Sequence, residues 1–130
     1  MTPDNVRRNV AAEIDRAGDS LRAASVLVDA GLLHDAESRL YYAIYHGAIA
    51  LLLTEGMEPR SHAGTSALLG QHFVRTGKLS PDDARLFARI QKYRLEADYG
   101  RDFVLTIDAL CEDLAACTGF LGRVRAIIGV

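Results

Sequence analysis

The chain has 130 residues, of which 49% are hydrophobic and 25% are charged, a balance typical of one soluble globular domain. Its formal net charge is −2, so the overall charge favours neither a nucleic acid nor a membrane surface. An anionic partner therefore has to be met by a local basic patch.

The N-terminal residues lack the apolar stretch of a signal peptide, and the longest apolar run, 48–53, is too short to span a bilayer. Cys111 and Cys117 lie six residues apart in an expected helix, so they point to different faces and cannot pair with each other. We expect a cytoplasmic protein without membrane contact, whose cysteines are small, buried and reduced.

Apolar residues recur every three to four positions, and no run alternates as a strand does. In chain order, the expected helices cover about 2–30, 33–54, 61 or 65 to 76, 81–99 and 103–128. The strongest start signal is Ser80-Pro81-Asp82-Asp83, a cap followed by proline and two acids. Because the loops are short, we expect one all-α domain over 1–130, an antiparallel up-and-down bundle of four to five helices.

Two patterns within the helices bear on metals and packing. None of the glutamates has a histidine three residues later, as a di-iron bundle needs, so we expect no metal site and no cofactor. Ala115, Gly119 and Gly122 form a line of small residues on the last helix. Because glycine inside a helix costs about 1 kcal/mol against alanine, we expect close packing here, within the bundle or across a dimer.

The segment SRLYYAIYHG, 38–47, places Arg39 and His46 seven residues apart, on one face of a helix and about 10 Å apart along its axis. Tyr42 lies between them on that face. The helix is apolar nearly all round, which predicts a central position in the bundle. His46 and the tyrosines can therefore be core residues with satisfied hydrogen bonds, or parts of a site.

His62 follows Ser61 at an expected helix start, where free backbone N–H groups suit an anion. It can contact a phosphate or act as an acid or base near neutral pH. Equally, Ser61 can be a plain helix cap and His62 a packing residue.

The segment KYRLEADYG, 92–100, combines two possible ion pairs, Arg94–Asp98 and Lys92–Glu96, at the spacing of helical neighbours. Exposed pairs of this kind contribute little to stability. Arg89 and Lys92 also continue a basic stripe that starts at Arg85. Tyr99 comes just before Gly100, where a helix end can offer its phenol to a cleft.

Four motifs in series, SRLYYAIYHGAIALL, SHAG, FVRTGKL and YRLEADYG, resemble the HEPN domain family, especially its small stand-alone bacterial and archaeal branch. The resemblance covers about residues 5–128. It implies a helical bundle that commonly forms a homodimer and is often encoded beside a minimal nucleotidyltransferase, many such pairs behaving as toxin and antitoxin. Active members are metal-independent ribonucleases, whose signature is an arginine, four to six residues, and then a histidine.

Arg94 takes the position of the signature arginine, but Tyr99, Gly100 and Arg101 stand where the histidine is expected. A phenol with its usual pKa near 10 is a poor base at neutral pH. The resemblance therefore implies a degenerate nuclease motif, unless His46 or His62 supplies the imidazole.

Three functions remain open at this point. In the first, the protein binds nucleotide or RNA in a nucleotidyltransferase-linked system, with Arg94 on phosphate, Asp98 orienting it and Tyr99 at the ligand. In the second, it is an active ribonuclease that uses Arg94 with His46 or His62. In the third, it is a purely structural dimer module. The further residues expected at a ligand are Arg39, Tyr42, His62, Arg89 and Lys92, with no DNA specificity.

Overall fold

The computed structural model describes residues 2–100 and 102–130, and these residues form helices without strands, as the sequence predicts. Arg101, which lies in the expected break after the fourth helix, is outside the described residues. The elements are α1 (Pro3–Asp29), α2 (Leu33–Thr54), α3 (His62–Leu69), the π-helical turn η1 (Gly70–Val74), α4 (Pro81–Tyr99) and α5 (Ile107–Ile128).

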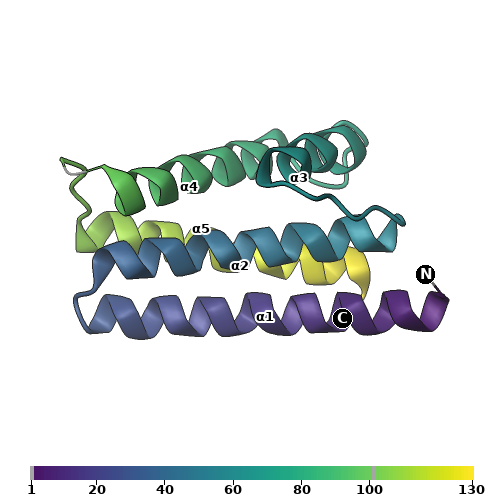
Figure 1. Cartoon of the computed structure of the whole chain (residues 1–130), viewed down its shortest axis with the longest axis horizontal. Helices are drawn as coiled ribbons and strands as arrows, with labels where there is room; N and C mark the ends of the chain where they lie inside the picture. The colour runs from purple at the N-terminus through teal and green to yellow at the C-terminus, as the bar shows by residue number, and fades with distance from the viewer. Residues whose placement is uncertain (1, 101) are drawn as a thin grey trace.

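Four long helices, α1, α2, α4 and α5, run up and down in alternation, which confirms the predicted bundle (Figure 1). The shorter α3 and η1 lie at the end of the bundle where α2 stops and α4 begins. Helix α2 packs against α1, α3, α4 and α5, so it is the central helix. No helix among the described residues has an apolar stretch that could cross a membrane.

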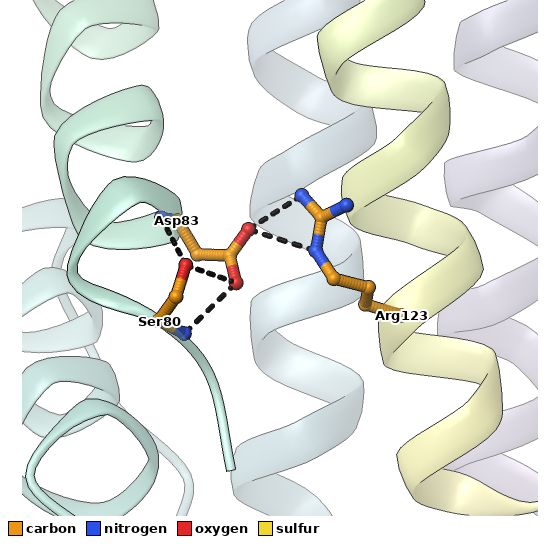
Figure 2. A network of polar contacts seen from close by, with 3 residues as sticks. All are labelled: Ser80, Asp83 and Arg123. Atoms are coloured by element: carbon orange, nitrogen blue, oxygen red, sulfur yellow. Dashed lines mark hydrogen bonds and ion pairs between the residues drawn. The ribbon is translucent and has the colours of Figure 1, made fainter. Parts of the chain in front are cut away.

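The start of α4 is fixed by a reciprocal cap and an ion pair (Figure 2). The Ser80 hydroxyl accepts from the backbone N–H of Asp83, while the Asp83 carboxylate accepts from the backbone N–H of Ser80 at 3.0 Å. The same carboxylate, 2% exposed, accepts from Nε of Arg123 on α5 at 2.9 Å. This confirms the predicted helix start and shows that the cap also ties α4 to α5.

The last helix differs from its prediction at its start and at one cysteine. It begins at Ile107 rather than Phe103, because the Thr106 side chain caps it by accepting from the backbone N–H of Ala109. Cys117 is buried as expected, but Cys111 is exposed. At the small residues of this helix, a Cβ at Gly122 would meet nothing within 4 Å, and one at Gly119 would meet Nη1 of Arg123 on the same helix at 3.2 Å, so neither glycine faces another helix closely; packing across a dimer stays a prediction.

Between α2, α4 and α5 lies a buried carboxylate that no sequence pattern indicated. Glu37 is fully buried, and neither of its carboxylate oxygens has a hydrogen-bond partner among the described residues. Burial, and after it the nearby charge of Asp113, raises the pKa of Glu37 from 4.5 to about 7, although Arg89 opposes the rise. The folded protein therefore favours the neutral, protonated form of this side chain.

Because the folded-state pKa of Glu37 lies above its ordinary value, its contribution to stability is fully present below pH 4.5 and is lost as the pH rises through about 7. Glu37→Gln should remove this loss. We expect the free energy of unfolding to rise by about 2 kcal/mol near pH 8 and to change little near pH 5, measured by urea denaturation. Glu58→Gln, which changes an exposed glutamate, is the matched control. An equal effect of Glu37→Gln at both pH values would contradict the assignment.

Candidate nucleotide-binding site

Arg94 reaches from α4 onto the surface of α2. Its Nη2 donates a hydrogen bond to the hydroxyl of Tyr42 at 3.1 Å. Its guanidinium carbon lies 5.3 Å from the ring centre of Tyr41 and 5.4 Å from that of Tyr42, within the range of cation–π attraction. Since the side chain is only 20% exposed, the guanidinium is held in a partly desolvated position.

The predicted ion pair between Arg94 and Asp98 is present, with Nε and Oδ2 3.1 Å apart. Nε is buried and does not meet the directional criteria of a hydrogen bond, so this contact is a charge–charge attraction rather than an aligned donor–acceptor pair. Asp98 therefore holds one side of the guanidinium, while Nη2 faces Tyr42.

A second guanidinium meets the same tyrosine ring. The guanidinium carbon of Arg39 lies 4.9 Å from the ring centre of Tyr42, and no carboxylate pairs with Arg39 among the described residues. We call Arg39, Tyr41, Tyr42 and Arg94 the arginine–tyrosine cluster. It brings two cations to one phenol, and among the described residues the only carboxylate that pairs with either cation is that of Asp98, so its local charge suits an anion.

His62 joins this cluster from the start of α3. Ser61 caps that helix by accepting from the backbone N–H of Gly64 at 2.9 Å. The fully buried hydroxyl of Tyr41 contacts Nδ1 of His62. Burial, and secondarily the charge of Arg94, lowers the pKa of His62, which keeps the imidazole neutral at neutral pH. Burial also raises the pKa of Tyr41, so its hydroxyl stays protonated and is the donor to Nδ1.

His46 is paired with a residue that the sequence did not single out. Its Nδ1 lies 2.6 Å from Oε2 of Glu13 on α1, and both side chains are about four-fifths buried. The ring centre of His46 is 6.3 Å from that of Tyr42, so the pair adjoins the arginine–tyrosine cluster. The available signal for Glu13 was its place beside the buried Ile14, at the edge of the apolar face of the first helix.

The remaining expected ligand residues lie apart from this cluster. Tyr99 is 77% exposed, and Lys92 is also exposed. Arg89 turns instead toward α5, where it donates to Asp113 at 2.9 Å. Arg85 pairs with Asp82. The basic stripe is thus largely neutralised, and no ion pair joins Lys92 to Glu96 in the described part of the chain.

The polar groups of the site do not assemble into a metal centre. Among residues 2–100 and 102–130, no three His, Cys, Asp or Glu side chains come together in a group that could hold a metal ion. The cations of the arginine–tyrosine cluster itself are the guanidiniums of Arg39 and Arg94.

Comparison with known proteins gives a match to the HEPN domain over residues 10–128. A protein named "Putative toxin MJ0605" from Methanocaldococcus jannaschii is 38% identical over 98 residues, 75% of this chain and 73% of that protein. "UPF0332 protein" from Thermotoga maritima is 30% identical over 113 residues, 87% of this chain and 86% of that protein. "Putative toxin MJ0142", also from M. jannaschii, is 33% identical over 96 residues, 72% of this chain and 63% of that protein. The domain match includes every residue of the arginine–tyrosine cluster.

Removing the Tyr41 hydroxyl should destabilise the fold, because it leaves Nδ1 of His62 without its buried donor. We expect Tyr41→Phe to lower the free energy of unfolding by about 1 kcal/mol in urea titrations. Tyr45→Phe is the matched control, since the Tyr45 hydroxyl makes no hydrogen bond within the described residues. An equal decrease in the two variants would show that the Tyr41–His62 contact contributes nothing specific.

Proposed function

The chain belongs to the HEPN family, and we propose that it binds the phosphate groups of a nucleotide or an RNA strand at the arginine–tyrosine cluster. The observation that carries this proposal is the convergence of Arg39 and Arg94 on the ring of Tyr42. Guanidinium groups recognise phosphate oxygens with two parallel N–H donors, and partial burial strengthens that attraction. Arg39 has no carboxylate to compete with such a ligand among the described residues.

Binding is favoured over cleavage by the residues that follow Arg94. In the positions where family ribonucleases carry histidine, this chain has Tyr99, Gly100 and Arg101. Tyr99 is largely exposed, which leaves its ring free to stack on a base of a bound strand. Asp98, paired with Arg94, orients the guanidinium rather than the ligand.

The proposed setting is a toxin–antitoxin-like system with a nucleotidyltransferase partner. Support comes from the family and from two relatives whose names include the words "putative toxin".

We also propose a homodimer, because large apolar side chains lie exposed around the connection between α4 and α5. They are Leu95, 47% exposed, Val104, 80%, and Ile107, 55%. A second copy on this surface would cover them and bring the two copies of Arg94 toward each other.

Binding can be measured by fluorescence anisotropy with a labelled single-stranded RNA oligonucleotide in EDTA. Arg94→Ala and Arg39→Ala should each weaken binding by about tenfold or more, because each removes a charge-assisted interaction. The slope of log K against log salt should become shallower by about 0.7 for each phosphate group that the variant no longer binds. Arg22→Ala is the matched control, since Arg22 is exposed and already paired with Asp19.

Two outcomes would overturn this function. If Arg94→Ala and Arg39→Ala both bind as tightly as the wild type, the arginine–tyrosine cluster is not the site. If no RNA or nucleotide binds and Arg94→Ala lowers the melting temperature, the polar residues serve folding alone, and the structural-module alternative holds. Cleavage of the RNA that Arg94→Ala abolishes would instead favour the ribonuclease alternative.

The assembly has its own test. Light scattering after size-exclusion chromatography should give about twice the 14.2 kDa of one chain, and Ile107→Asp should yield monomers of unchanged helicity. Val130→Asp, an exposed site at the other end of α5, should leave the mass unchanged. A monomeric wild type contradicts the dimer. If the protein does not co-purify with the product of an adjacent nucleotidyltransferase gene, the proposal of a nucleotidyltransferase partner is contradicted.

A further inference from the structure

One stripe of α2 stays partly open to solvent while the rest of the helix is covered. Between residues 36 and 53, the positions that are not buried are Ser38, Arg39, Tyr42, Tyr45, His46 and Ile49. Their spacing of three and four residues places them on one side of the helix. Helix α2 lies between α1 and α4, with α5 behind it (Figure 1). Arg94 of α4 meets the stripe at Tyr42 and Glu13 of α1 meets it at His46, so these two helices border it.

The two ends of this stripe differ in charge and in shape. At one end Arg39 and Arg94 meet the ring of Tyr42, where the proposed phosphate binds. Ile49 lies seven residues beyond Tyr42, about 10 Å further along the helix axis. There it lines a groove of about 340 Å³ between α1, α2 and the loop that follows α2. The rings of Tyr42 and His46, 6.3 Å apart, connect the two ends, so a ligand that lies along the stripe reaches both.

The lining of the groove combines apolar surface with charged side chains. Its apolar residues are Ala12, Ile49, Leu53 and Pro59. Its charged residues are Glu13, Arg16 and Glu58, and Arg16 makes no ion pair within the described part of the chain. Because two carboxylates outnumber one guanidinium, the groove does not suit a second phosphate group. Apolar surface beside a few polar groups suits the flat, uncharged base of a nucleotide.

The positions of Glu13 and Arg16 favour one base over the others. They lie three residues apart on α1, so their side chains are neighbours on one face of that helix. The Glu13 side chain is about four-fifths buried, and its Oε2 lies 2.6 Å from Nδ1 of His46. Guanine offers two adjacent donors, N1–H and the N2 amino group, followed along its edge by two adjacent acceptors, O6 and N7. Adenine and cytosine offer one amino group beside ring acceptors, and uracil offers a single N–H between two carbonyl oxygens.

We propose that the groove between α1 and α2 is a guanine pocket, in which the Glu13 carboxylate accepts from N1–H and the N2 amino group while Arg16 donates to O6 and N7. This inference rests on the proposed function, because Arg39 and Arg94 hold the phosphate of the same ligand. It names the ligand class as a guanosine phosphate, which can be a free nucleotide or part of an RNA strand. Both forms present the same base edge and are separated by experiment.

The full chain is titrated in EDTA with labelled RNA oligonucleotides of sequence UUXUU, followed by fluorescence anisotropy, where X is guanine, adenine, cytosine or uracil. The guanine oligonucleotide should bind about tenfold more tightly than the other three, because a bidentate contact to a base edge discriminates by about that factor. Unlabelled guanosine monophosphate is then added as a competitor. Displacement at a Kd similar to that of the strand assigns the pocket to the free nucleotide, and displacement by the unlabelled oligonucleotide alone assigns it to a strand. Either result supports the guanine pocket.

Two base analogues test the contacts separately, since inosine lacks the N2 amino group and 7-deazaguanine lacks N7. Glu13→Gln should weaken binding of the guanine oligonucleotide by about tenfold and that of the inosine oligonucleotide by less. Arg16→Gln should likewise affect guanine more than 7-deazaguanine, whereas the loss of a merely structural residue would weaken all oligonucleotides equally. Arg16 is exposed, so its variant keeps the pocket testable if Glu13→Gln does not fold. Asp15→Asn changes an exposed acid that lines a different groove on α1, and it is the matched control.

The inference fails if guanine binds no more tightly than the other three bases, or if Glu13→Gln and Arg16→Gln weaken every oligonucleotide by the same factor. In either case the proposed function still stands when Arg94→Ala and Arg39→Ala weaken the binding of all oligonucleotides. Wild-type affinity in both of those variants would remove the proposed function itself, so the two failures are distinguishable.

Discussion

Burial of α2 on nearly all sides is the constraint on which the other features of this protein depend. The helix packs against α1, α3, α4 and α5, yet its sequence places Tyr41, Tyr42 and His46 among the apolar residues. A polar group taken from water must find a partner in the protein or lose free energy. The partners come from three other helices: Arg94 from α4, His62 from α3 and Glu13 from α1. The polar side chains of α2 need partners from the neighbouring helices, and this need brings the residues of the site together.

The same requirement gives the site its chemical character. Arg94 is held by Asp98 and Tyr42, so its guanidinium is oriented before any ligand arrives. Arg39 lacks such a carboxylate among the described residues, which leaves its charge for an incoming anion. By contrast, Arg89 and Arg123 are held by Asp113 and Asp83, and they join α4 to α5. Arginines that look alike in the sequence thus separate into two that meet the ring of Tyr42 and two that pair with carboxylates between α4 and α5.

Local patterns were sufficient to predict the bundle, the central position of the second helix, the cap at Ser80 and the Arg94–Asp98 pair. These features depend on neighbours within one or two helical turns. The Glu13–His46 contact joins residues 33 positions apart, and Arg94–Tyr42 joins residues 52 apart, so only the packing of the helices reveals them. The start of the last helix was wrong by four residues, because Thr106 lacks the proline and the second acid that mark the cap at Ser80. Glycines at 119 and 122 indicated close packing within the bundle or across a dimer, and neither glycine lies close to another helix of the same chain.

The central claim is that RNA lies against the paired arginines of α2 and α4. Photocrosslinking of a single-stranded RNA that carries 4-thiouridine, followed by mass spectrometry of the digested protein, tests this most directly. Adducts are expected on peptides that contain Tyr42 or Tyr99, and they should disappear when Arg39 and Arg94 are both changed to alanine. Adducts confined to the α1–α5 side of the bundle, or unaffected by that double change, would contradict the claim.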